Sequence, residues 1–485
     1  MKREFQVRFC ERVGGCHSGY FLLYSTKKSK RPNKLQPPNI FAKTHTQITQ
    51  NYTNTMKTTH FLSLTTCLIL STFIACKKDD YCKNVRHTIA PNSNNLVQDE
   101  RFFTASTQKY ILLHTANSGD NNLYYAAYEG ESSEQYFEVI VNPDGSIYQP
   151  TTQPTANIKH TIGKTSTNGT LQWSKSLAFY PNPLTALTQA SGQYKNSLAV
   201  CGSESNKGRV VLLNTTGTPQ LDYKLTKIDT TVLIRKLAWI ENTTNGFRAA
   251  AVGYVTPTGS DFSYGYAFIC RIENNQLSIE KQYLSTDGYY SDVLLTNNRL
   301  YISGGNPVLA VFDLQLNKLT SMGETTDQYT RLATNGTSVF VAGTRPSDDG
   351  LRQEAQIRAY SIANNTKIWD RYLFDQNYWS YGLSVAAVGN KVFMVGGFAM
   401  AKLYDPTCTE EYAYPRGYAC LSRVDATTGD LFSDNIYLFG DEANQSMFHN
   451  ITAVGNTLYT GGYTNYTEEG QDSKGWLLHL NANDF

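Results

Sequence analysis

Aromatic residues recur beside polar residues at four places in the second half of the chain. They lie in "STDGYYSD", "TTDQYTR", "FDQNYWSYG" and "ANQSMFHN". The flat apolar face of a sugar stacks on an aromatic ring, while polar neighbours bind its hydroxyls. The alternative is that these rings pack inside the protein. The candidate ligand-binding residues are Tyr290, Tyr329, Arg331, Tyr378, Trp379, Phe448 and His449.

Residues that could catalyse a reaction or bind a metal form no known pattern. Five histidines follow residue 76, and none is spaced from another as metal ligands are. The motifs HExxH, GxSxG and the P-loop are absent. Carboxylates from distant segments could still cleave a glycosidic bond. We predict no catalytic residue, no metal and no cofactor, and the sequence does not identify the charged centre that a quinone would need.

The cysteines carry little information. Cys408 and Cys420 flank "TEEYAYPRGYA" and could form a disulfide in an oxidising compartment. Cys201 and Cys270 lie in apolar strand patterns, which indicates buried small side chains.

An apolar segment ending at a cysteine indicates export. After Met56-Lys57, the run "FLSLTTCLILSTFIA" has no charge, and its length suits a secretory signal better than a membrane span. Ile74-Ala75-Cys76 resembles the cleavage motif of bacterial lipoproteins. That resemblance implies that residues 56–75 are removed and that Cys76 carries acyl chains, which would place it in outer-membrane lipid. A buried strand and a plain signal peptide are the alternatives.

Residues 1–55 show no apolar period and hold ten basic and two acidic residues. We interpret them as a leader from a wrongly chosen start codon, or as a disordered basic arm. "KKDD" begins directly after Cys76 and resembles the signal that sends some lipoproteins to the outer face of the outer membrane. A surface-exposed outer-membrane lipoprotein is therefore expected, with a periplasm-facing one as the alternative.

Charge argues against nucleic acid as a partner. Residues 1–75 hold 11 of the 43 basic residues and 2 of the 41 acidic ones. The remainder has 32 basic and 39 acidic residues, a net charge of −7. Nucleic-acid binding requires basic patches.

A repeat of about 50 residues predicts the fold. One motif is a turn, a short apolar strand and a glycine, as in "NSLAVCG", "FRAAAVG", "NKVFMVGG" and "NTLYTGG". We expect the glycine to end the strand. The second motif is strand, turn, strand, as in "VVLLNTTGTPQLDY" and "LSRVDATTGDLFSD". Together they form four-stranded units, which predicts an all-β propeller. A β-sandwich would not repeat so regularly.

The propeller is expected to occupy residues 101–485, with seven antiparallel four-stranded blades; eight or six remain alternatives. The chain ends at "GWLLHLNANDF", which supplies a third strand and no fourth. A strand near residues 85–105 should complete that blade, so residues 76–100 are interpreted as a tether and closing strand.

Two of the turns carry a family resemblance. "RVDATTGDLF" and "NGTLQW" resemble repeats of the quinoprotein-like and WD40-like bacterial propellers. This resemblance implies the fold and no chemistry. In a propeller, the connections between blades and between second and third strands share one face. That face contains the long loops and the aromatic segments, so we expect it to bind the ligand.

Three functions remain open at this point. The first is a lipid-anchored scaffold that binds a glycan or protein through the loop-rich face. The second is an enzyme, either a glycan hydrolase or lyase or a quinoprotein. The third is a structural subunit of an envelope assembly.

Overall fold

The computed structural model describes residues 96–485 apart from several short internal gaps. The gaps are 104–108, 121, 131–139, 142–146, 149–158, 167–169, 261, 286–287, 306, 324–327, 347–352, 373–377, 401–416, 441–444 and 467–473. The predictions for the leader, the signal segment, Cys76 and Cys408 fall outside the described residues, as do the side chains of Tyr329, Tyr378 and Trp379.

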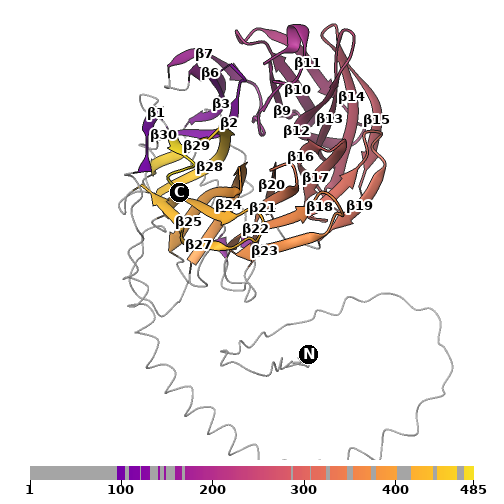
Figure 1. Cartoon of the computed structure of the whole chain (residues 1–485). Coiled ribbons are helices and arrows are strands. Elements are labelled where there is room, and N and C mark those ends of the chain that lie inside the picture. Colours follow the sequence, from indigo (N-terminus) through magenta and orange to yellow (C-terminus); the bar gives the residue numbers. More distant parts are fainter. Residues whose placement is uncertain are drawn as a thin grey trace, which may run out of the picture. The chain divides into compact units, whose positions relative to one another are not determined.

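Seven four-stranded antiparallel sheets form a ring, with the first strand of each blade nearest the axis (Figure 1). The predicted seven-bladed propeller is thus confirmed, and the sandwich is wrong. The first four blades are β2 (Lys109–Asn117), β3 (Asn122–Gly130), β6 (Lys159–Ser166) and β7 (Leu171–Leu177); β8 (Thr185–Ala186), β9 (Leu198–Glu204), β10 (Lys207–Leu213) and β11 (Pro219–Leu225); β12 (Thr230–Asn242), β13 (Gly246–Pro257), β14 (Tyr264–Glu273) and β15 (Gln276–Leu284); and β16 (Tyr290–Thr296), β17 (Arg299–Gly304), β18 (Leu309–Phe312) and β19 (Lys318–Met322).

The remaining blades complete the ring. They are β20 (Gln328–Thr334), β21 (Ser338–Pro346), β22 (Gln353–Ser361) and β23 (Lys367–Tyr372); β24 (Tyr378–Val388), β25 (Lys391–Met400), β26 (Gly417–Asp425) and β27 (Leu431–Phe439); and β28 (Gln445–Val454), β29 (Thr457–Tyr466), β30 (Lys474–Asn481) and β1 (Asp99–Phe103). A separate hairpin pairs β4 (Ile140–Val141) with β5 (Ile147–Tyr148), and η2 (Gly192–Tyr194) is a 3-10 turn. No helix in the described part of the chain is long and apolar enough to cross a membrane.

The last blade is closed by the first strand of the chain, as predicted. Strand β1 pairs antiparallel with β30, from Asp99 opposite His479 to Phe103 opposite Gly475. The indole Nε1 of Trp476 donates to Glu100 Oε1 at 2.6 Å, which adds a side-chain link to the backbone pairing. Two segments of the described chain more than 370 residues apart are therefore held in one sheet.

Burial follows the position of a strand within its blade. The inner strand β10 is buried at nearly every residue because both of its faces contact neighbouring blades. The outer strand β15 alternates between exposed and partly buried residues. Apolar clusters fill the spaces between blades, for example around Phe268 and around Phe312.

The recurring glycine has a different role from the one expected. Strand β13 continues past Gly253, and β25 continues past Gly396. A Cβ on Gly253 would lie 1.9 Å from the carbonyl oxygen of Leu233, and one on Gly396 would lie 1.7 Å from that of Tyr381. The prediction that the glycine ends the strand is therefore wrong for these two blades, although β17 does end at Gly304. It is needed because the neighbouring first strand approaches too closely for a side chain.

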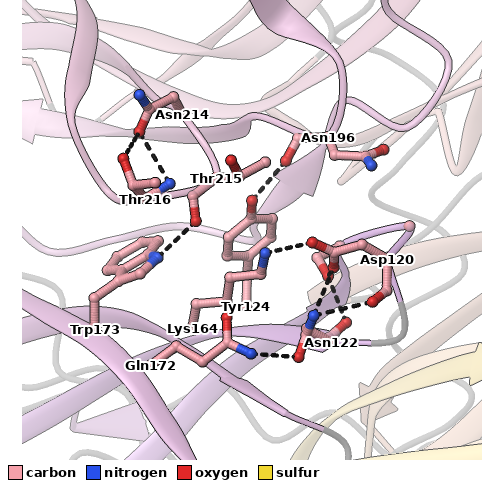
Figure 2. A network of polar contacts seen from close by, with 12 residues as sticks. Asp120, Asn122, Tyr124, Lys164, Gln172, Trp173, Asn196, Asn214, Thr215 and Thr216 are labelled. Carbon is pink, nitrogen blue, oxygen red and sulfur yellow. Dashed lines mark hydrogen bonds and ion pairs between the residues drawn. The ribbon is translucent and has the colours of Figure 1, made fainter.

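A polar network joins the first two blades (Figure 2). Lys164, 4% exposed at its side chain, forms an ion pair with Asp120 at 2.5 Å and lies over the Tyr124 ring. The Tyr124 hydroxyl donates to the carbonyl of Asn196 at 2.5 Å. We call the network of Asp120, Asn122, Tyr124, Lys164 and Gln172 the junction network.

A tryptophan secures the same junction. Trp173 Nε1 donates to the carbonyl of Thr215, in the "NTTG" turn of the next blade, at 2.9 Å (Figure 2). Trp369 repeats this contact on the carbonyl of Ala426, in the "ATTG" turn, at 3.3 Å. The Thr-Gly turns noticed in the sequence thus receive an aromatic side chain of the preceding blade.

Candidate functional site

The first strands of the blades share an irregularity near the axis. In six of them the pairing with the second strand contains an extra residue, which defines a β-bulge. Bulges re-aim side chains and are common beside functional sites. Two bulged residues, Leu113 and Leu383, lie with Met447 in one apolar cluster. Blades 1, 6 and 7 therefore contribute apolar side chains here.

A second group of side chains near the axis is mostly cationic. His114 in blade 1 is 8% exposed. Burial lowers its pKa well below the usual value, and the charges of Arg331, Arg235 and Lys236 lower it further, as does His449 when it is protonated. These residues come from blades 5, 7 and 3, which are not neighbours of one another, so their side chains converge toward the axis. We call His114, Arg235, Lys236, Asp292, Arg331 and His449 the axial cluster.

Asp292 supplies a carboxylate to this cluster and is fully engaged. It is 1% exposed and forms an ion pair with Lys236 at 2.6 Å. Its second oxygen accepts a hydrogen bond from the backbone N–H of Leu332, in the next blade, at 2.9 Å. Asn450 holds the corresponding position in blade 7 and accepts from the Thr115 N–H at 3.2 Å. This position links adjacent first strands, which argues for a structural role of Asp292.

The guanidinium groups are held in place by neighbours from other blades. Arg235 donates from Nη1 to Asn182 Oδ1 at 3.0 Å and lies 5.6 Å from the Tyr254 ring centroid. Burial lowers the pKa of Arg331, and the charge of Arg235 adds to this, whereas Asp292 opposes it. Among the described residues, the axial cluster thus contains three cationic side chains and one carboxylate.

Three tyrosines lie beside the cations. Tyr254 and Tyr289 meet edge to face with their ring centroids 6.3 Å apart. Tyr180 is 39% exposed. Tyr180 and Tyr289 lie close enough to Arg331 to affect its pKa. Tyr289 directly precedes β16, and Tyr254 lies in the second half of β13. Both positions are toward the loop-rich face.

The aromatic residues predicted to stack on a ligand are buried where the structure describes them. Tyr290 is 1% exposed and packs edge-on against Phe312 at 6.5 Å. Phe448 has no exposed surface and packs between Phe439 and Trp476. For these two residues the stacking prediction fails, and the alternative of packing inside the protein fits, because their apolar rings fill spaces between strands.

Two other predicted residues, Arg331 and His449, belong to the axial cluster. Burial lowers the pKa of His449 to about 4, so it is neutral at pH 7. Cys420 is a buried free thiol in β26, and burial raises its pKa. The proposed partner, Cys408, lies outside the described residues.

Several residues of the site were missed from sequence. Arg235 and Lys236 interrupt an apolar strand in "VLIRKLAW", and two adjacent cations there are a usable signal. In "GYYSD" the sequence favoured Tyr290 and overlooked Tyr289. Successive side chains of a strand face opposite sides, so one ring of the pair was always expected to point differently from the other.

Comparisons with known proteins find distant structural likenesses to other propellers. No protein-family model matches this chain, and no curated protein matches it. The propeller domain of Cps50 (Swd1) from Myceliophthora thermophila is 11% identical over 78% of this chain and 98% of that one, with a TM-score of 0.45. BamB from Moraxella catarrhalis is 11% identical over 78% and 96%, with a TM-score of 0.38. The propeller of the trilobed protease from Pyrococcus furiosus is 9% identical over 76% and 96%, with a TM-score of 0.41.

Proposed function

We propose that this protein is a lipid-anchored propeller of the bacterial cell envelope that binds a glycan or protein ligand through its loop-rich face. The observation that carries the proposal is topological. The strand that follows the tether enters the ring at one face, and the long connections leave from the other. The long connections therefore stay clear of the segment by which the proposed tether joins the ring.

The entry point of the tether is defined by two backbone contacts. The N–H of Gln98 donates to the carbonyl of His479, near the end of β30, at 2.9 Å. The N–H of Ala482, just beyond β30, donates to the carbonyl of Asn456 at 2.8 Å. Asn456 lies in the tight turn between β28 and β29. Residues 96–98 therefore enter at the face of the short hairpins.

The two faces differ in the length of their connections. On the hairpin face, two residues join β24 to β25 and two join β28 to β29. On the loop-rich face, 16 residues separate β25 from β26 and 28 separate β3 from β6. Long connections on a rigid scaffold are where binding residues are usually found.

The axial cluster favours binding over hydrolysis. Cleavage of a glycosidic bond uses two carboxyl groups, one of which must donate a proton. Asp292 is occupied by Lys236 and by the N–H of Leu332. The convergent side chains of the described residues are mainly cations, which suit the recognition of a ligand.

The anchor is tested by metabolic labelling with an alkyne-bearing fatty acid in a Gram-negative host. We expect the full chain to be labelled and to fractionate with membranes, and Cys76→Ser to lose both properties. Cys67→Ser, within the signal segment, is the matched control and should remain labelled. Equal labelling of the full chain and Cys76→Ser would contradict the anchor.

The ligand face is tested by glycan arrays and pull-downs with the purified protein. A cysteine placed at Thr258, between β13 and β14, is then modified with a bulky maleimide. This modification should block the binding of the ligand identified by the arrays or pull-downs. The same modification at Asn335, in the hairpin between β20 and β21, should not. Failure to find a ligand by either method, or equal block at both positions, would contradict the proposal.

A further inference from the structure

We propose that the axial cluster binds a carboxylate of an acidic glycan, such as one built from uronic acids. This inference rests on the proposed binding function and names the class of its ligand. The cluster brings Arg235 and Lys236 from blade 3 and Arg331 from blade 5 toward one axis.

The charge balance of the described residues favours an anion. Lys236 is paired with Asp292, whose other oxygen is taken by a backbone N–H. Arg235 donates to a neutral partner, Asn182, and no carboxylate pairs with it among the described residues. A bound carboxylate would compensate the charge of Arg235 and form charge-assisted hydrogen bonds with it.

Nε of Arg235 and Nδ1 of His114 are buried polar atoms of the cluster, and neither has a hydrogen-bond partner in the described part of the protein. Buried polar atoms in native proteins are nearly always hydrogen-bonded, and an exception calls for a ligand or water. These two atoms belong to blades 3 and 1. A group that satisfied either one would lie near the axis, where the cations converge.

The tyrosines favour a sugar over an acidic peptide as the carrier of the carboxylate. Tyr254 lies under the Arg235 guanidinium and meets Tyr289 edge to face. Tyr180 lies close enough to Arg331 to affect its pKa, and 39% of its surface is exposed. Aromatic rings beside fixed cations offer a stacking surface for a sugar ring together with a partner for its acid group.

The test is calorimetric titration of the purified protein with tetragalacturonate and with its methyl ester. The two probes share one sugar backbone, and the ester replaces each charged carboxylate with a neutral, slightly larger group. We expect the acid to bind at least about tenfold more tightly than the ester, and its affinity to fall as salt is raised. Equal affinity for acid and ester, or no binding of the acid, would overturn the proposal.

Variants locate the binding. Arg235→Gln and Arg331→Gln should each weaken binding of tetragalacturonate about tenfold, and Arg235→Lys should retain most of it. The matched control is Arg271→Gln, which removes an outer arginine of blade 3 that pairs with Glu280. It should leave binding unchanged. Unchanged affinity in both axial variants would overturn the proposal. The comparisons of acid with ester and of low with high salt use the unaltered protein. They therefore test the proposal even if a variant does not fold.

A third probe separates this inference from the proposed function. If a poly-glutamate peptide binds more tightly than tetragalacturonate, the glycan assignment is wrong. The arrays could instead find a neutral glycan whose binding is blocked by modification at position 258, while tetragalacturonate does not bind. In that case the proposed function stands and this inference is wrong.

Discussion

Two polar groups of this molecule, each with a buried member, differ in how many of their charged and polar atoms are paired. In the junction network, Lys164 is paired with Asp120, and Tyr124 donates to a backbone carbonyl (Figure 2). In the axial cluster, the described residues bring three cations to one carboxylate, and Arg235 Nε and His114 Nδ1 have no partner there. A balanced network stabilises the fold by itself. A cation-rich group gains from an added anion.

The largest effect is expected where the balance is broken. Asp120→Ala leaves the buried Lys164 without its counter-ion, although the ring of Tyr124 remains beneath it. Because the Asp120 side chain is itself 34% exposed, we expect a loss of about 3 kcal/mol of unfolding free energy, the lower end of the range for breaking a buried pair. Urea denaturation followed by circular dichroism measures it. Asp430→Ala, at a 75% exposed carboxylate, is the control and should cost less than about 1 kcal/mol. Equal losses in the two variants would show that the ion pair of Lys164 and Asp120 stabilises the fold no more than an exposed one does.

The bulge that carries Arg235 is the next target. Gly253 lies opposite the residue before this bulge, and a Cβ there would strike the Leu233 carbonyl. Gly253→Ala should lower the unfolding free energy by about 3 kcal/mol through overpacking. The substitution should also weaken the binding of tetragalacturonate, because it would displace Arg235. A variant as stable as the parent would refute the role given to this glycine.

Acidification should destabilise the ring through its buried histidines. Burial lowers the pKa of His449 and of His160 to about 4. The unfolded chain, with histidine pKa values near 6.5, therefore binds more protons between pH 6.5 and 4. Stability is then complete above pH 6.5 and is lost as the pH falls toward 4.

The loss should be about 2 kcal/mol for each histidine, allowing for partial exposure to solvent. Urea titrations at pH 7 and pH 4.5 measure it. The double variant His160→Gln/His449→Gln should show a smaller difference between the two pH values. An unchanged difference would mean that other groups control the acid response.

The smallest effect on stability is expected at Arg331 of the axial cluster. Arg331→Gln relieves repulsion from Arg235 but loses the attraction of Asp292. The unfolding free energy should therefore change by less than about 1 kcal/mol in either direction. Thermal melts of the ligand-free protein check this. A loss comparable with that of Asp120→Ala would remove the distinction between the two regions.

The sequence predicted what depends on local pattern. Repeated strand and turn motifs indicated four-stranded blades, and the missing last strand indicated closure by residues near 100. The bulges were not predicted, because an extra unpaired residue leaves no mark in hydrophobic alternation. Gly253 and Gly396 were noticed but interpreted as strand ends, whereas both lie inside strands. The convergence of His114 and Arg331 depends on ring closure across more than 200 residues.

The same reasoning explains the mixed outcome for the site. Arg331 and His449 were chosen because they precede or follow aromatic residues, and both lie in the axial cluster. Tyr290 and Phe448 were chosen for their rings, and both rings are buried in the core. Ring size alone does not distinguish a residue that fills a space between blades from one that meets a ligand.

The most direct test of the comparison is one calorimetric series with tetragalacturonate on three proteins. They are the parent, the axial variant Arg235→Gln and the junction variant Asp120→Ala. The account predicts that the junction variant, although less stable, binds as the parent does, while the axial variant binds about tenfold more weakly. Loss of binding in the junction variant, with full binding in the axial one, would contradict it.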